Sequence, residues 1–153
     1  MLINWPNSAI ETRMAYDENN IFAKMLRVEI PCHKLYEDEN ALAFLDIMPR
    51  SGGHTLVITK EKARDLFDVS PEALAKLMAV VRKLAPKIKE AVGAEGVLIQ
   101  QFNGAAAGQT VFHLHVHIVP RKEGEPLKPH AGKMEDQAKL AATAEKIRAN
   151  MKA

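Results

Sequence analysis

The sequence lacks several features that are typical of secreted and membrane proteins. Its 153 residues contain one cysteine, Cys32, which cannot form an internal disulfide, so we expect a reducing compartment. The apolar runs fall far short of the roughly 20 residues that a membrane-spanning helix needs. The N-terminus also lacks the basic and then apolar regions of a secretory signal. We therefore expect a cytoplasmic protein that binds no membrane.

The sequence also lacks a large excess of charge of one sign. Lys and Arg number 21 and Asp and Glu 19, which gives a formal net charge of +2, and the two signs are interspersed along the chain. A protein that binds nucleic acid usually concentrates basic residues in a stripe, so no nucleic-acid partner is expected. The hydrophobic share of 47% is ordinary for a globular domain. A stable core therefore requires neither a disulfide nor a metal ion.

The pattern of apolar and turn-forming residues predicts an α+β fold. Helices are predicted from Asn20 to Pro31, from the N-cap Ser70 with a kink at Pro86, and over 135–151. Strands are predicted at 34–37, 41–46, 54–59, 96–102 and 111–119. Most of these strands neighbour one another along the chain, which favours an antiparallel sheet.

Three of the six histidines stand at alternate positions, His113, His115 and His117. In a strand they would share one face, while the intervening apolar residues would face a core. The chance of such a run in this composition is roughly one in a hundred. The run therefore indicates a functional site.

One chemistry open to these histidines is metal binding, because neutral imidazole is a common zinc ligand. Alternate residues of a strand lie about 6.6 Å apart and the outer pair roughly 13 Å apart, so only two neighbours would share an ion. Neither a carboxylate nor a thiolate lies at a spacing from these histidines that is typical of metal ligands. We expect no metal ion and no cofactor.

The other chemistry is covalent catalysis, in which a neutral imidazole attacks a phosphorus atom. The charge on the non-bridging oxygens then needs nearby donors, which flanking imidazolium and backbone N–H groups can supply. The Gly- and Ala-rich loop at 103–108 lets a phosphate approach the backbone closely. Nucleophilic attack on phosphorus is the favoured interpretation.

Residues 108–120, together with 30–38 and 43–58, resemble the signature of the histidine triad (HIT) superfamily. The similarity covers about residues 20–121 and is greatest to the branch that hydrolyses nucleoside phosphoramidates. The resemblance implies a five-stranded antiparallel sheet with flanking helices and a homodimer joined into one continuous sheet. It divides the chain into an N-terminal arm at 1–19, a HIT domain at 20–121, and a C-terminal extension with a helix at 122–153.

The resemblance also implies catalytic roles. His115 corresponds to the nucleophile that becomes nucleotidylated on the α-phosphate, and His117 to the histidine near the phosphate oxygens and the bridging atom. His113 and His54 correspond to the pair that supports and orients the nucleophile. Thr110 stands where the family has a hydroxyl that contacts the leaving group or the phosphate.

Further positions are implied to bind substrate. Asp46 and Ile47 correspond to residues that line the ribose and base pocket. Gln109 is expected to line the phosphate site through its backbone, beside Gly108, and Asn103 is a candidate for a polar contact with the substrate.

Two positions depart from the family pattern. Phe102 stands where many relatives carry an amide that contacts the substrate, and Asn103 or Gln101 is the candidate replacement. Residues 20–23 hold no thiols, whereas some bacterial relatives have there a Cys pair that helps to hold zinc. His33 and His130 are isolated in the sequence and are expected on the surface.

The function implied is cleavage at the α-phosphate of purine nucleoside phosphoramidates or related nucleotides through a nucleotidyl-histidine. Two alternatives stay open, a dinucleoside polyphosphate hydrolase and a non-catalytic regulator that binds purine nucleotides.

Overall fold

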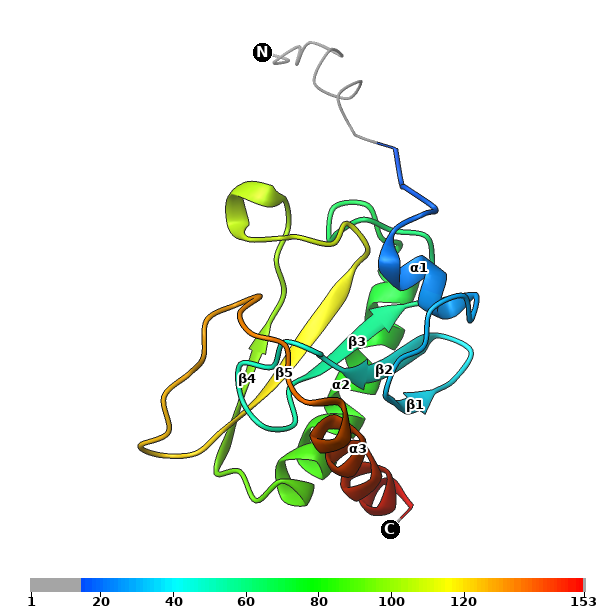
Figure 1. Ribbon diagram of the computed structural model, residues 1–153. Coiled ribbons are helices and arrows are strands. Elements are labelled where there is room, and N and C mark those ends of the chain that lie inside the picture. The colour runs from blue at the N-terminus through cyan, green and yellow to red at the C-terminus, as the bar shows by residue number, and fades with distance from the viewer. Residues whose placement is uncertain (1–14, 153) are drawn as a thin grey trace, which may run out of the picture.

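The computed structural model describes residues 15–152, so most of the predicted N-terminal arm lies outside the described residues. The elements are, in order, α1 (Ile21–Leu26), β1 (Lys34–Glu37), β2 (Ala41–Leu45), β3 (Thr55–Thr59), α2 (Pro71–Ala91), β4 (Gly96–Gln100), β5 (His115–Arg121) and α3 (Gln137–Met151). A short 3₁₀ turn at Ala105–Ala107 lies between β4 and β5. The chain thus has the predicted α+β fold (Figure 1).

The five strands form one antiparallel sheet in the order β1-β2-β3-β5-β4 (Figure 1). Strand β5 lies between β3 and the edge strand β4. It pairs with β3, which sets His115 opposite Ile58 and His117 opposite Leu56. On its other side β5 pairs with β4, with His117 opposite Gln100. His117 is therefore flanked by strands on both sides, whereas His115 pairs with β3 alone.

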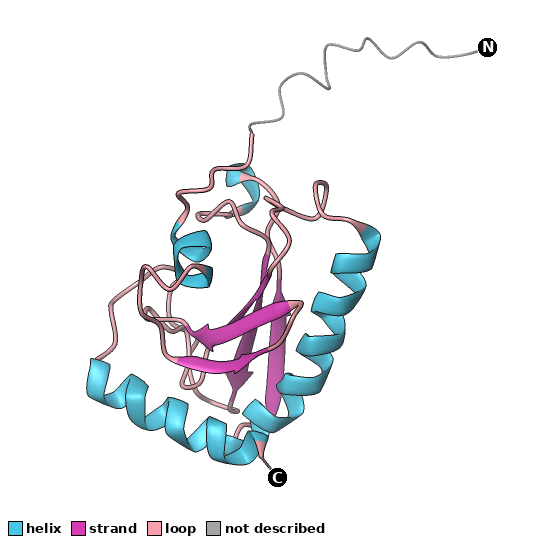
Figure 2. Cartoon of the chain, turned by 90° about the vertical axis from the view of Figure 1, so that its right-hand side faces the viewer, coloured by secondary structure: helices cyan, strands magenta, loops and turns pink. Residues whose placement is uncertain are grey.

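The sheet buries both of its faces, and every residue of β2 and β3 is accordingly buried, with polar side chains only at Thr55 and Thr59, the two ends of β3. One face packs against α2 and α3 and carries Val116 and Ile118 of β5. The other face carries Phe44 and Leu56 and packs against Phe22 of α1. Figure 2 shows the strands between the long helix α2 and the short helix α1. Since side chains alternate along β5, His115 and His117 lie on the α1 face.

The long helix α2 begins as its sequence predicts. The Ser70 hydroxyl oxygen accepts a hydrogen bond from the N–H of Ala73 at 3.1 Å, and Pro71 occupies the first turn. The helix continues through Pro86 to Ala91, and Gly93 follows it with φ +67°. Among residues 15–152, no helix is both long enough and apolar enough to cross a membrane.

Several predicted boundaries are wrong, and contacts or backbone angles in the structure explain three of them. Helix α1 ends at Leu26, well before Pro31, because Val28 takes φ +60° and breaks the helix. Strand β4 ends at Gln100, because the next residues turn toward the loop at 66, where Asn103 Oδ1 accepts the Leu66 N–H at 2.8 Å.

Strand β5 begins at His115 and not at 111. The carbonyl of Leu114 still accepts the N–H of Thr59, the last residue of β3, at 3.3 Å, but its N–H donates to the carbonyl of Ala63 in the loop after β3, at 2.9 Å, so the ladder ends here. His113 consequently lies before the strand. The prediction that all three histidines belong to one strand is wrong for His113.

Candidate active site

A pocket of about 430 Å³ opens on the α1 face of the sheet. His115 and His117 form part of its wall, and apolar side chains from α1, β2 and β3 form another part. Residues 30–33, the residues after β2, Thr110 with Val111, the segment between β5 and α3, and the start of α3 also line it. An apolar cleft with a few converging polar groups is the usual form of a site for a small ligand.

The tautomer of His115 leaves one ring nitrogen, Nε2, without a proton. Its Nδ1 lies 2.6 Å from the carbonyl oxygen of His113, and because a carbonyl only accepts, Nδ1 carries the proton. The lone pair is therefore on Nε2. Burial lowers the pKa of His115 to about 4, so the ring is neutral at pH 7. A neutral imidazole with a free lone pair is a nucleophile.

His117 has the opposite arrangement, which a chain of hydrogen bonds imposes. The backbone N–H of Arg50 donates to Nδ1 of His54 at 3.0 Å, so the proton of a neutral His54 is on Nε2. That Nε2 lies 2.9 Å from Nδ1 of His117, which therefore accepts, and the proton of His117 is on Nε2. Burial lowers the pKa of His54 to about 3 and that of His117 to about 2, so both rings are neutral.

The two pocket imidazoles are thus complementary. His115 offers a lone pair and His117 an N–H donor, and the ring centroids lie 5.1 Å apart. Nε2 of His117 is buried and has no hydrogen-bond partner within residues 15–152. This pair can attack an electrophile and, at the same time, donate to an oxygen bound to that electrophile.

His113 acts on the site through its main chain. Its side chain is buried under Phe22, and Nε2 donates to the carbonyl of Thr59 at 2.7 Å. Its Nδ1 then accepts from the Tyr16 hydroxyl, also at 2.7 Å. Sequence reasoning missed Tyr16, which is an isolated residue ahead of the first helix and carries no pattern that would single it out.

Asp46 follows β2 and lines the pocket together with Ile47. Its Oδ1 accepts the N–H of Met48 at 2.8 Å, and its Oδ2 lies 3.6 Å from Nε2 of His54. Burial raises the pKa of this carboxyl. The sequence showed no carboxylate near the histidines, but the turn after β2 brings one there.

Asp46, His54 and His117 offer donor atoms within 4.8 Å of one another, the only such group in the described part of the chain. Two of these residues are already joined, since Nε2 of His54 donates to Nδ1 of His117. Nε2 of His117 has no partner among the described residues, and Oδ2 of Asp46 lies 3.6 Å from Nε2 of His54.

The remaining predicted residues fall into two groups. Thr110 is exposed and lines the pocket. Gln109 is buried and braces the preceding loop, since its amide accepts from Gly104 N–H at 2.8 Å and donates to the Arg64 carbonyl at 2.7 Å. Gly108 is exposed with φ +100°, and its hydrogen bond closes the 3₁₀ turn.

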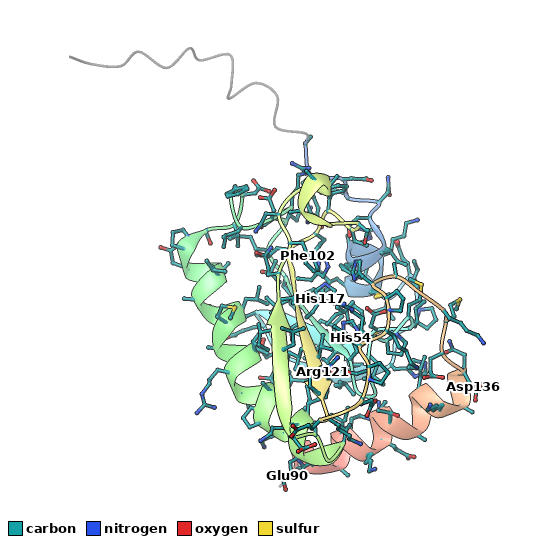
Figure 3. The ribbon with its side chains drawn as sticks, turned by 90° about the vertical axis from the view of Figure 1, so that its left-hand side faces the viewer. His54, Glu90, Phe102, His117, Arg121 and Asp136 are labelled. Carbon is teal, nitrogen blue, oxygen red and sulfur yellow. The ribbon has the colours of Figure 1, made fainter. Side chains whose placement is uncertain are left out.

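The candidate amides do not line the pocket. Nε2 of Gln101 donates to Oδ1 of Asn103 at 2.7 Å, and Nδ2 of Asn103 donates back at 2.8 Å. Phe102, between them, packs its ring 5.3 Å from that of His117. Figure 3 shows His117 between His54 and Phe102. A substrate contact through Asn103 or Gln101 stays a prediction.

His130 is the clearest correction to the sequence analysis, which expected an isolated surface residue. The segment after β5 brings it into the pocket, with its ring centroid 5.6 Å from His117 and 5.5 Å from Phe102. Its Nε2 is buried without a partner in the described structure. No spacing in the sequence relates it to the triad. His33 is half-buried, with Nε2 2.9 Å from Oε1 of Gln137.

Known proteins are similar to this chain in sequence and in fold. The family model described as HIT domain matches residues 27–124. Adenylylsulfatase HINT3 of Arabidopsis thaliana is 40% identical over 124 residues, which are 77% of this chain and 63% of the relative. The adenosine 5′-monophosphoramidase hnt1 of Schizosaccharomyces pombe is 43% identical over 105 residues, 69% of this chain and 76% of that protein.

A solved structure is similar over nearly the whole chain. The Hit-like protein from Bartonella henselae, described as involved in cell-cycle regulation and crystallised with an unknown ligand, is 48% identical. The match covers 90% of this chain and 99% of that one, with a TM-score of 0.85. Sequence model, relatives and fold agree, and the chain belongs to the HIT family.

Proposed function

We propose that this protein is a nucleotide hydrolase in which Nε2 of His115 takes the nucleotidyl group from a purine nucleoside 5′-phosphate derivative and passes it to water. The observation that carries the proposal is the paired tautomers of His115 and His117, a bare nitrogen beside an N–H donor. Two relatives, described as an adenylylsulfatase and an adenosine monophosphoramidase, support a substrate with an α-phosphate.

The pocket offers a place for each part of a nucleoside monophosphate. Phe22, Phe44 and Leu56 give an apolar wall suited to a base, and the Asp46 carboxylate can accept hydrogen bonds from ribose hydroxyls. His115, His117 and the Thr110 hydroxyl lie where the α-phosphate would then sit. Gln109 and Gly108 hold the loop that precedes Thr110.

The reaction has two steps. The Nε2 lone pair of His115 forms a bond to phosphorus, and the bond from phosphorus to the leaving group breaks, its electron pair going with the leaving group. A phosphoramidate reacts in its N-protonated form, so ammonia departs without further proton transfer. The N–H of His117 donates to the charged oxygens throughout. Water then attacks phosphorus, the P–N bond to His115 breaks, and the nucleotide leaves as a proton passes to solvent.

We further propose that two chains join through the edge strand β4 into one continuous sheet. Strand β4 has a sheet neighbour on one side only, and Ile99 on it is 42% exposed. An open edge with an apolar side chain is a template for pairing with another strand. Light scattering coupled to gel filtration checks this proposal, and an Ile99→Lys variant should shift the mass toward that of one chain.

The test of the catalytic proposal is the intact mass of the protein after brief mixing with adenosine 5′-phosphoramidate and quenching in denaturant at neutral pH. A nucleotidyl adduct is expected on the wild type and on Lys133→Ala, an exposed control. His115→Asn, whose amide can still donate to the His113 carbonyl, should form no adduct. Turnover by that variant at the wild-type rate contradicts the mechanism.

Two further arms separate the alternatives. Faster cleavage of diadenosine tetraphosphate than of the phosphoramidate assigns the protein to the dinucleoside polyphosphate hydrolases. Tight nucleotide binding with neither adduct nor turnover indicates a binding regulator. A rate that falls with a chelator and returns with zinc indicates that the Asp46, His54 and His117 group holds a metal.

A further inference from the structure

The segment between β5 and α3 is fixed across one end of the pocket. The N–H of Lys128 donates to the carbonyl of Arg50 at 3.0 Å, and Nε of Arg50 donates back to the Lys128 carbonyl at 3.0 Å. Further along, the N–H of Glu135 donates to the carbonyl of Ile47 at 2.8 Å. In Figure 1 this segment is the orange loop that returns past β5 before α3. It is therefore tied at two points to the turn that follows β2.

Between these two ties the segment places His130 against His117. The two rings meet edge to face, with their planes at 70°. Each ring has a buried Nε2 without a hydrogen-bond partner, and no other buried side-chain nitrogen or oxygen within residues 15–152 lacks one. Unpaired buried polar atoms are rare in folded proteins. Two of them, on facing rings of one pocket, indicate that a bound ligand forms the missing hydrogen bond of each Nε2.

The ligand group that fits here is an anion. Arg50 lies behind His54 and holds Nη1 2.8 Å from Oε1 of Gln100. Nε2 of His117 carries a proton that no described residue accepts, so a negatively charged ligand oxygen would complete its hydrogen bonding. The carboxylate of Asp46 lies on the His54 side of this pair, with Oδ2 3.6 Å from Nε2 of His54.

We propose that His130 is a substrate-binding residue which, with His117, holds the leaving group, and that it makes the enzyme favour a tetrahedral oxyanion as leaving group over a neutral amine. The inference rests on the proposed function, because it assumes that the α-phosphate sits over His115 and His117. When sulfate or phosphate leaves, the P–O bond breaks and the electron pair stays on that oxygen, so negative charge grows where His130 lies. Ammonia leaves uncharged and gains little from the same contact.

The kinetic test compares three substrates of the full chain. They are adenosine 5′-phosphosulfate, ADP and adenosine 5′-phosphoramidate, and the variants are His130→Ala and His130→Gln. Loss of a charge-assisted hydrogen bond should lower kcat/KM about 10-fold or more for the phosphosulfate, for ADP or for both, and less than about 3-fold for the phosphoramidate. Glutamine, which keeps an N–H donor on a side chain of a different shape, should give an intermediate loss. The oxyanion substrate with the larger loss identifies the leaving group.

A binding test removes the chemistry. In a His115→Asn background, His130→Ala should weaken binding of adenosine 5′-phosphosulfate about 10-fold, measured by calorimetry, and should leave binding of AMP nearly unchanged. Lys133→Ala, an exposed cation three residues away, is the matched control and should change neither affinity. Thermal melts of every variant show whether the fold is kept.

The outcomes separate the two proposals. An adduct on His115 together with equal losses on all three substrates, or with no loss, overturns the role of His130 and leaves the proposed function standing. Absence of adduct and turnover on every substrate overturns both. A fall in binding that is the same for AMP and for the phosphosulfate shows that His130 only shapes the pocket, and this too overturns the inference.

Discussion

Nδ1 of His115 lies 2.6 Å from the carbonyl oxygen of His113, two residues earlier in the chain. This contact fixes the tautomer of the candidate nucleophile by a main-chain atom, and the ring of His113 serves to hold that atom in place through the Thr59 carbonyl and the Tyr16 hydroxyl. In the proposed mechanism the order of the triad thus has a physical meaning: the first histidine positions the second, the second attacks and the third donates a hydrogen bond.

Removing the hydroxyl of Tyr16 should loosen this support. Tyr16→Phe leaves Nδ1 of the buried His113 without its donor, which should lower the free energy of unfolding by about 1–3 kcal/mol and slow adduct formation a few-fold. Urea unfolding and rapid-quench mass measurements check both effects. Tyr36→Phe is the matched control, since its hydroxyl donates to Asp38 on the far edge of the sheet. Equal effects of the two changes would argue against a role for Tyr16.

Removing the His54 side chain from the chain of hydrogen bonds should allow His117 to adopt either tautomer. With His54→Asn, Nδ1 of His117 loses its donor, and the proton can move from Nε2 to Nδ1. We expect kcat for the phosphoramidate to fall about 100-fold, the usual size of a misplaced proton-donor effect. Nucleotide affinity should change much less, because the base and ribose contacts remain. A variant with unchanged kcat contradicts the tautomer argument.

The pH dependence of adduct formation should reflect the lowered pKa of His115. Burial holds that pKa at about 4, so the lone pair on Nε2 is free at every pH above this value. The rate of the first step should stay level from pH 8 to pH 5 and fall only near pH 4, measured by rapid quench with the phosphosulfate. A fall centred at pH 6.5, the ordinary value for histidine, would show that the ring is not buried as described.

Stability should also depend on pH, with a sign that follows from the same burial. His54, His113, His115 and His117 have pKa values below 6.5 in the fold, so the unfolded chain binds more protons once the pH falls under 6.5. The free energy of unfolding is therefore highest above pH 6.5 and should decrease as the pH falls below it. Asp46, whose pKa is raised by burial, opposes this trend at lower pH, because the folded chain holds that proton more tightly than the unfolded chain. Urea titrations from pH 8 to pH 5 test the slope.

Two adjacent glycines offer a test of the turn that leads into His54. Gly53 has φ +88°, and a Cβ added to it would lie 2.9 Å from Cγ1 of Val92. Gly52 has nothing within 4 Å of the same position. Gly53→Ala should lower the free energy of unfolding by about 1–3 kcal/mol, whereas Gly52→Ala should change it by less than about 0.5 kcal/mol. Similar melting temperatures for the two variants would contradict the described turn.

Local signals were sufficient to predict most of the fold. Ser70 and Pro71 mark the start of α2 because the N-cap and the first turn depend on neighbouring residues only. The end of β4 and the start of β5 were misplaced because they depend on contacts between distant loops, such as Leu114 with Ala63. No periodicity within a strand reports on such a partner.

The candidate site divides in the same way. The alternation of His115 and His117 survives in the structure because both lie in β5. Tyr16 and His130 were not predicted because each meets its triad partner, His113 or His117, through a hydrogen bond or ring contact between residues far apart in the sequence. Asp46 was placed by family resemblance, but its position beside His54 follows from the turn after β2.

The chain of hydrogen bonds through His54 and His117 starts at the backbone N–H of Arg50. A peptide N–H does not titrate in the pH range in which a protein stays folded, so its proton is always present. The tautomer of His117 is thus determined by the main-chain geometry of the turn at 50–54. Substituting the side chain at position 50 does not remove this donor. Any residue that keeps this turn can stand at position 50 without reversing the polarity of the site, with proline, which has no N–H to give, as the exception.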